Sequence, residues 1–226
     1  MMNSLLKRII TSLFLILILC FCLFYSDLSW KILVSIFSVI CFYEFCLLIN
    51  KMYINKILST ILIFLTGLYL YFFYLLIIKI NSAYGSEIIL ILIITCVFSD
   101  IGGYIVGKLI GGPKLSKISP NKTISGSIGS IFFTIIGTCL FVLFLNKIEK
   151  DPILLEFSIV FLIWLIMMSV FCQVGDLFIS YLKRKANVKD TGKILPGHGG
   201  ILDRVDGMIF AIPFGVLLFL TLGLDI

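Results

Sequence analysis

The chain has 226 residues, of which 61% are hydrophobic and only 13% are charged. Soluble domains are about 45–50% apolar and about 25% charged, so this composition excludes a soluble protein and predicts an all-α, polytopic integral membrane protein. The net charge of +6 comes without a basic stretch interleaved with aromatic residues, so we expect no nucleic-acid partner.

Seven apolar stretches are candidates for membrane-spanning helices, each of which needs about 20 mostly apolar residues. In chain order they cover residues 9–25, 30–49, 57–78, 87–106, 124–145, 153–172 and 207–224. The first stretch follows Lys7 and Arg8 and lacks a small-x-small cleavage site after it, which favours a retained anchor over a signal peptide. We expect a single integral membrane domain over residues 1–226.

The distribution of lysine and arginine predicts the orientation of these spans. With the N-terminus in the cytoplasm, the inner segments hold 14 of the 18 basic residues and the outer segments hold 4. This asymmetry follows the positive-inside rule. It also places the polar loops 107–123 and 173–206 on the same cytoplasmic side, and we expect them to form the active site together with the adjoining helix ends.

Asp100 and Glu44 are carboxylates that lie well inside apolar stretches. An ionisable residue inside a membrane segment is a functional candidate, and Asp100 in the fourth stretch is one. Glu44, in the second stretch, either contributes to a site or forms a hydrogen bond to another helix.

The loop 107–123 ends in a polar, glycine-rich run around Lys122 and Thr123. A lysine, hydroxyl groups and the free N–H groups at the start of the next helix can together bind phosphate. The alternative is that this run only connects two spans.

The loop 173–206 contains a polar island, residues 180–206, in an otherwise apolar chain. The island holds the only histidine, His198, and three carboxylates, Asp190, Asp203 and Asp206. It also holds six cations, which are Lys183, Arg184, Lys185, Lys189, Lys193 and Arg204. Such charge density between membrane segments predicts a water-facing site for a phosphate-bearing substrate.

The residues that lead into the island have helical spacing. If this segment is a helix, Asp176, Ser180, Lys183 and Arg184 share one face, because they stand at i, i+4, i+7 and i+8. The helix would then present a carboxylate and two cations on the same side.

Two further carboxylates stand three residues apart at the end of the island. We expect Asp203 and Asp206 to share one face at the start of the last helix. Convergent carboxylates and phosphate oxygens make a typical magnesium site, with Asp176 as a third ligand. The alternative is that Asp203, Arg204 and Asp206 are surface charges that cap a helix.

The island also contains a glycine-rich turn around His198. Glycine lacks a Cβ, so the backbone at Gly197, Gly199 and Gly200 can approach a ligand closely. His198 either binds phosphate or is an ordinary loop histidine.

Taken together, these motifs resemble the signature of the phosphatidate cytidylyltransferase (CDP-diacylglycerol synthase) family. The matching residues are Ser180, Lys183-Arg184, Lys189-Asp190, Pro196-Gly197-His198-Gly199-Gly200 and Asp203-Arg204-Val205-Asp206. Upstream, Ser99-Asp100 and Lys122-Thr123 are similar to a second block of the family, and Glu44-Phe45 to an acidic–aromatic pair in its early helix.

The resemblance implies a magnesium-dependent nucleotidyltransferase of phospholipid biosynthesis. It would convert CTP and phosphatidic acid into CDP-diacylglycerol and pyrophosphate, as a multi-pass homodimer in the lipid of the cell inner membrane, with its active site facing the cytoplasm. A second cation such as K⁺ is compatible with the family.

The resemblance also implies roles for individual residues. The catalytic group is Lys183, Arg184, His198 and Arg204. The substrate-binding group is Ser180, Lys122, Thr123, Lys189, Gly197, Gly199 and Gly200. The metal ligands are Asp176, Asp203 and Asp206, with Asp100 as a further candidate.

Two other functions fit parts of the pattern. A CTP-dependent kinase of a lipid alcohol would use the same nucleotide but transfer its γ-phosphoryl group, and would release CDP. A transporter would use Glu44, Asp100 and Asp176 as an ion path, but it leaves the cation-rich island without a role.

Overall fold

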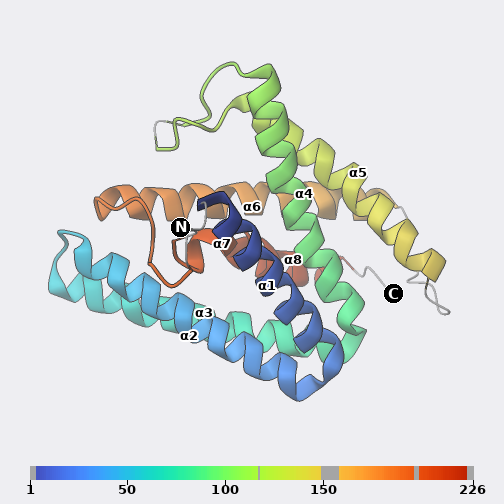
Figure 1. The fold of residues 1–226 in the computed structure, drawn as a ribbon, viewed down its shortest axis with the longest axis horizontal. Coiled ribbons are helices and arrows are strands. Elements are labelled where there is room, and N and C mark those ends of the chain that lie inside the picture. Colours follow the sequence, from blue (N-terminus) through green and yellow to red (C-terminus); the bar gives the residue numbers. More distant parts are fainter. Residues whose placement is uncertain (1–3, 117, 149–157, 196–198, 223–226) are drawn as a thin grey trace. The chain divides into compact units, whose positions relative to one another are not determined.

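The computed structural model describes residues 4–116, 118–148, 158–195 and 199–222, which fold almost entirely into helices (Figure 1). In chain order the helices are α1 (Ser4–Tyr25), α2 (Asp27–Lys51), α3 (Lys56–Tyr84), α4 (Ser86–Ile110), α5 (Ile124–Ile148), α6 (Ile159–Lys185), α7 (Leu202–Val205) and α8 (Met208–Thr221). Within these residues, the only β-structure is two isolated bridges, Lys114 with Thr123 and Leu195 with Gly199. The prediction of an all-α protein is confirmed.

Five of the described helices, α2 to α6, are long and apolar enough to cross a membrane. These helices confirm an integral membrane protein. The other two predicted spans correspond to shorter apolar helices, Ile9–Tyr25 within α1 and Met208–Thr221 in α8.

Helix α6 continues well past residue 172, where the predicted sixth span ends. The prediction that 173–206 is a loop is therefore wrong for its first 13 residues, which are helical. Hydropathy marks where a segment leaves the apolar layer, whereas the backbone hydrogen bonds of a helix continue into water. The helical spacing of Asp176, Ser180, Lys183 and Arg184 is confirmed.

The end of α6 is a Schellman motif. Asn187 adopts a left-handed conformation with φ 52°, and the N–H of Val188 donates to the carbonyl of Lys183 at 3.0 Å. Three cations, Lys183, Arg184 and Lys185, occupy the last turn, where the helix dipole favours positive charge. Local sequence therefore stops the helix inside the polar island.

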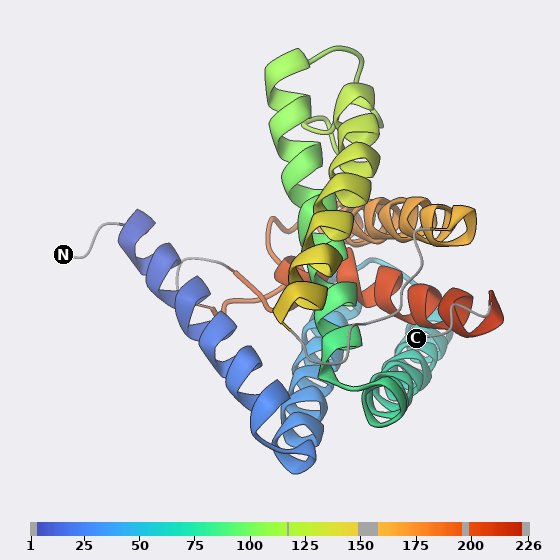
Figure 2. The ribbon, with the colours of Figure 1, turned by 90° about the vertical axis from the view of Figure 1, so that its right-hand side faces the viewer.

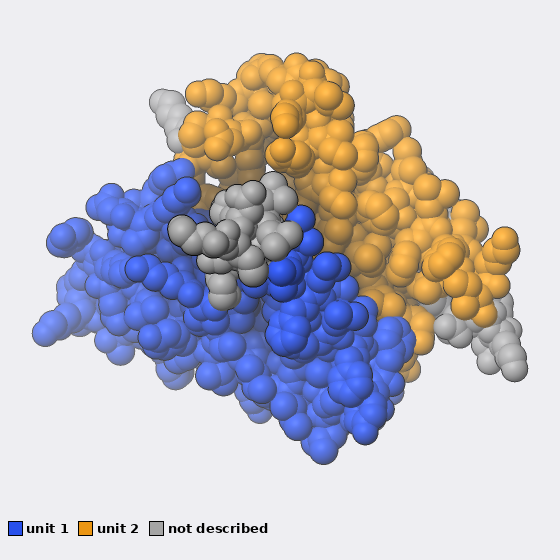
Figure 3. Space-filling model, in the orientation of Figure 1, with its two compact units in different colours: residues 1–82, 181–205 blue, residues 83–180, 206–226 orange. Residues whose placement is uncertain are grey.

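The chain divides into two compact units, coloured separately in Figure 3. Unit 1 consists of residues 1–82 and 181–205, and unit 2 of residues 83–180 and 206–226. Helix α6 belongs to unit 2 up to Ser180 and to unit 1 from Tyr181.

Unit 1 is built on α1, α2 and α3. Ser26 separates α1 from α2 and forms a capping box with Ser29, which fixes the turn between the two helices. Phe37 of α2 and Phe73 of α3 have ring centroids 6.1 Å apart, and these two helices lie side by side in Figures 1 and 2. The short helix α7 also packs against α2.

Unit 2 is built around α4 and α5, which run side by side in both views (Figures 1 and 2). Small residues bring these helices together: a Cβ on Gly126 would lie 2.8 Å from the carbonyl oxygen of Gly103. A hydrogen bond of 2.8 Å from the Trp164 indole N–H to the Gly215 carbonyl joins α6 to α8. This hydrogen bond holds the Trp164 part of α6 against α8 within unit 2.

Candidate functional site

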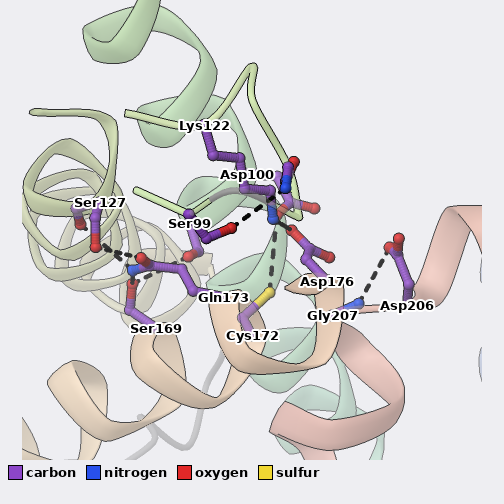
Figure 4. A network of polar contacts seen from close by, with 12 residues as sticks. Ser99, Asp100, Lys122, Ser127, Ser169, Cys172, Gln173, Asp176, Asp206 and Gly207 are labelled. Carbon is purple, nitrogen blue, oxygen red and sulfur yellow. Dashed lines mark hydrogen bonds and ion pairs between the residues drawn. The ribbon is translucent and has the colours of Figure 1, made fainter. Parts of the chain in front are cut away.

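Unit 2 contains an ion pair between two of the predicted site residues. Lys122 Nζ lies 2.7 Å from Asp176 Oδ2, and the two side chains are 31% and 18% exposed. Asp100 lies with them in Figure 4, and its Oδ1 is 3.8 Å from Cys172 Sγ, one turn before Asp176 in α6. The structure therefore brings together Asp100, Lys122 and Asp176, from three separate elements.

Close backbone packing places the Asp206–Gly207 turn against α6. A Cβ on Gly207 would lie 2.9 Å from Asp176 Oδ1, and one on Gly175 would lie 2.6 Å from the Asp206 carbonyl. Only glycine fits these two positions without moving the neighbouring atoms. Asp206 is thus held beside Asp176 within unit 2.

The expectation that Asp203 and Asp206 share one helix face is wrong. Asp203 lies in α7, whereas Asp206 lies in the turn between α7 and α8. Helix α7 ends at Val205, and the turn at Asp206 and Gly207 separates it from α8, so the helical spacing does not continue from Asp203 to Asp206. The two residues also belong to different units.

A network of neutral polar side chains orients the part of α6 next to Asp176 (Figure 4). The Gln173 amide donates to the Ser127 carbonyl and to Ser169 Oγ, at 3.3 Å each, and its oxygen accepts from the Ser127 hydroxyl. Ser169 is also 3.0 Å from Ser99 Oγ. Hydrogen bonds of this kind tie α4, α5 and α6 together in an apolar environment.

The loop before α5 is held by backbone bonds that position Lys122. The N–H of Leu115 donates to the Lys122 carbonyl at 2.8 Å, and that of Ile124 donates to the Pro113 carbonyl at 3.0 Å. Thr123 Oγ1 accepts from the N–H of Gly126 at 3.0 Å, so it caps α5. The structure thus gives Thr123 a structural partner at the position predicted to bind substrate.

Unit 1 contains a second ion pair, between Lys183 and Asp203. Lys183 Nζ lies 2.8 Å from Asp203 Oδ1, and the Asp203 side chain is only 4% exposed. The other oxygen, Oδ2, accepts from the N–H groups of Thr191 at 2.7 Å and Gly200 at 3.1 Å. Asp203 is therefore not a surface charge, although it does bind backbone donors near the start of α7.

These contacts keep Asp203 ionised. Burial alone raises the pKa of this carboxyl, but the Lys183 ammonium and the N–H groups of Thr191 and Gly200 outweigh burial and lower its pKa below the ordinary value. At neutral pH the residue carries a full negative charge that faces Lys183.

The remaining predicted residues are distributed along the island. Arg184, Lys189 and Arg204 are exposed, and Ser180 is half-buried in α6. Gly199 has φ +89° and exchanges two backbone hydrogen bonds with Leu195, which closes the turn. The predicted residues Gly197 and His198 lie outside the described residues.

Two residues of unit 1, Glu44 and Thr191, form hydrogen bonds to residues of the island that the sequence did not indicate. Glu44 is fully buried and forms hydrogen bonds to Thr191 and to the N–H of Leu202 in α7, so its predicted hydrogen bond to another helix is present. Thr191 contacts both Glu44 and Asp203. No sequence signal singled out Thr191. Its partner Glu44 lies 147 residues away, and its contact with Asp203 depends on how the island folds.

The oxygen donors of the site suit a hard cation. Among the residues that the structure describes, no group of three or more His, Cys, Asp or Glu side chains is arranged to hold a metal ion. Magnesium, however, uses only one or two protein carboxylates when it also binds substrate phosphates and water. Asp176 and Asp206 in unit 2, or Asp203 in unit 1, therefore fit magnesium that binds with a nucleotide.

Comparisons with known proteins agree with the motif pattern. A model of the cytidylyltransferase family matches residues 49–222. A protein of Bacillus subtilis named phosphatidate cytidylyltransferase is 34% identical over 192 residues, which cover 84% of this chain and 69% of the relative. A protein of the same name from Helicobacter pylori J99 is 41% identical over 60% of this chain and 48% of the relative.

A third relative, from Staphylococcus aureus COL, also has this name and is 42% identical over 57% of the chain and 47% of the relative. In the Helicobacter and Staphylococcus comparisons, the chain spans about half the length of the curated relatives that it matches.

The Lys183–Asp203 pair generates a test of stability. Lys183→Met leaves a nearly buried carboxylate without its cation, so we expect it to lower the free energy of unfolding by about 1–3 kcal/mol. Lys193→Met, which removes an exposed lysine of the same segment, is the matched control and should change stability little. Thermal unfolding in detergent measures both variants. Equal melting temperatures would contradict a stabilising role for the pair.

Proposed function

The chain belongs to the cytidylyltransferase family, and we propose that it is a phosphatidate cytidylyltransferase, which converts CTP and phosphatidic acid into CDP-diacylglycerol and pyrophosphate. The observation that carries the proposal is the similarity to relatives of that name, at 34–42% identity. The arrangement of lysines and carboxylates within each unit supports it.

The reaction joins two polyanions, so charge neutralisation and positioning are its main requirements. An oxygen of the lipid phosphate attacks the α-phosphorus of CTP, and the bond from that phosphorus to the bridging oxygen breaks as pyrophosphate leaves. A phosphomonoester has a second pKa of about 6, so it is mostly a dianion at neutral pH and needs no strong general base.

Cationic side chains are proposed to bind the phosphates. Lys122 in unit 2 and Lys183 in unit 1 already lie against carboxylates, which hold their ammonium groups in place. Arg184 and Arg204 are exposed and can reach phosphate in water. His198, Gly199 and Ser180 retain the substrate-contacting roles that the family resemblance implies.

Asp176, Asp203 and Asp206 are proposed to hold magnesium, with Asp100 beside Asp176. When bound, the cation would offset the negative charge of the CTP phosphates. Asp203 Oδ1 is the oxygen proposed to bind the metal, because Oδ2 accepts hydrogen bonds from the N–H groups of Thr191 and Gly200. A second cation such as K⁺ would be compatible with the family.

The proposed placement in the membrane follows from charge. Seven membrane segments with a cytoplasmic N-terminus put most of the lysine and arginine on the inner side, where cytosolic CTP reaches the island. A bacterial inner membrane and a homodimeric assembly complete the proposal.

A substrate-omission assay tests the function. The purified protein should release pyrophosphate only when CTP, phosphatidic acid and a divalent cation are all present, with CDP-diacylglycerol as the lipid product. Release of CDP with a prenol acceptor would instead show a lipid-alcohol kinase. Absence of turnover with every acceptor would contradict both enzymes.

Asp176 provides the test of the carboxylate site in unit 2. Asp176→Asn should lower turnover by about 10²-fold or more, since loss of one electrostatic stabiliser has effects of this size. Asp27→Asn, which changes an exposed aspartate at the start of α2, is the control and should retain full turnover. Pyrophosphate release at saturating substrate measures both. Normal turnover in Asp176→Asn would remove this residue from the site.

Lys122 competes with a metal ion for the Asp176 carboxylate, because its ammonium is 2.7 Å from Oδ2. Lys122→Met should therefore strengthen magnesium binding in the absence of nucleotide while it lowers turnover. The magnesium concentration that raises the melting temperature measures the binding. Lys114→Met, at an exposed lysine of the same loop, is the control. Weaker or unchanged magnesium binding in Lys122→Met would argue against Asp176 as a ligand.

A further inference from the structure

Glu44 lies in the middle of α2, and its side chain is fully buried. Its carboxylate accepts three hydrogen bonds, all from the polar island some 150 residues later. Thr191 Oγ1 donates to Oε2 at 3.0 Å, the N–H of Leu202 donates to Oε2 at 2.8 Å, and that of Ile201 donates to Oε1 at 3.1 Å. A buried carboxylate without such donors would be strongly unfavourable.

Two of these donors are backbone N–H groups at the start of a helix, where the helix itself supplies no acceptor. Leu202 begins α7 and Ile201 precedes it, so their N–H groups have no carbonyl partner within that helix. Leu202 is itself 2% exposed, which removes water as an alternative acceptor for its N–H. Glu44 and the start of α7 thus satisfy each other.

The backbone of the island is shaped around the Glu44 carboxylate. A Cβ on Gly192 would overlap Glu44 Oε1, and one on Gly200 would overlap both Thr191 Oγ1 and Glu44 Oε2. These two glycines therefore allow the island to close onto α2. Gly200 was predicted to contact substrate, and in the structure its α-carbon faces this carboxylate.

The contacts continue from Glu44 to Asp203. Thr191 Oγ1 lies 3.0 Å from Glu44 Oε2 and 3.0 Å from Asp203 Oδ2. The N–H groups of Thr191 and Gly200 donate to that same Asp203 oxygen. Oδ2 thus binds the island backbone, whereas Oδ1 accepts from Lys183 Nζ at 2.8 Å.

We propose that Glu44 is a positioning residue for cytidylyl transfer, which fixes Thr191 and the start of α7 and through them the direction of the Asp203 carboxylate. The proposal rests on the proposed function. Glu44 would act through these residues, from a helix long and apolar enough to cross a membrane, on a segment that the sequence predicts to be a polar loop.

Glu44→Gln tests the proposal. It replaces one carboxylate oxygen, which accepts hydrogen bonds, by an NH₂ group, which can only donate them. Amide hydrogen exchange of the full-length protein in detergent should become at least about tenfold faster at Ile201 and Leu202, whose N–H groups donate to Glu44, the effect of losing one buried hydrogen bond. In the same variant, turnover should fall and the half-saturating magnesium concentration should rise, while the KM for phosphatidic acid changes little.

Thr191 supplies a rescue experiment. Thr191→Val removes the hydroxyl that joins Glu44 to Asp203 and should reproduce the magnesium effect of Glu44→Gln, whereas Thr191→Ser keeps the hydroxyl and should restore it. Thr138→Val is the matched control, since it removes a buried hydroxyl that donates to Thr95 at 3.2 Å in unit 2. It should leave exchange in the island and the magnesium dependence unchanged.

Three results separate the outcomes. Unchanged exchange in Glu44→Gln would overturn the anchoring role. Faster exchange with normal turnover and normal magnesium dependence would overturn the positioning role. Absence of CDP-diacylglycerol from the unmodified protein would overturn the proposed function instead, and the exchange experiment needs no turnover to be read.

Discussion

A carboxylate in apolar surroundings must be matched by hydrogen-bond donors or by a cation, and this requirement organises the polar parts of the protein. Glu44 is matched by donors of the island, Asp203 by Lys183 and two backbone N–H groups, and Asp176 by Lys122. The matches of Glu44 and Asp176 join segments that are distant in sequence, and that of Asp203 closes the island on itself. The polar island is therefore a folded element whose shape depends on these charges.

The same matching suits the phosphate chemistry that we propose for the protein. The two lysines lie against carboxylates and are held in place before any phosphate arrives, which lowers the reorganisation that a polyanionic substrate demands. The polar network around Gln173 adds rigidity in unit 2, where it joins α6 to α4 and α5. The apolar helices thus supply a stiff frame for a small number of charged groups.

The sequence predicted those features that depend on local pattern. Hydropathy located α2 to α5 within a few residues, and helical spacing predicted the polar end of α6 that hydropathy alone assigned to a loop. The break at Asp206 and Gly207 escaped prediction, because a three-residue spacing is equally compatible with a turn. The family resemblance was confirmed by a match over residues 49–222.

The contacts of Glu44 could not be predicted, because its partners lie 147 to 158 residues away and two of them are backbone groups without a side-chain signal. Periodicity places a residue on a face but does not say which distant loop covers that face. The same limit applies to the ion pair between Lys122 and Asp176. The sequence predicted a phosphate-binding role for Lys122 and a metal-binding role for Asp176, but not that the two side chains meet.

The most direct measurement follows the phosphorus atoms of CTP. The purified protein would be supplied with phosphatidic acid and with CTP labelled at either the α- or the γ-phosphorus, and the lipid product would be extracted and counted. Cytidylyl transfer predicts that only the α-label enters the lipid and that the γ-label leaves as pyrophosphate. Transfer of the γ-label to lipid would contradict the account, because it would show phosphorylation of the acceptor.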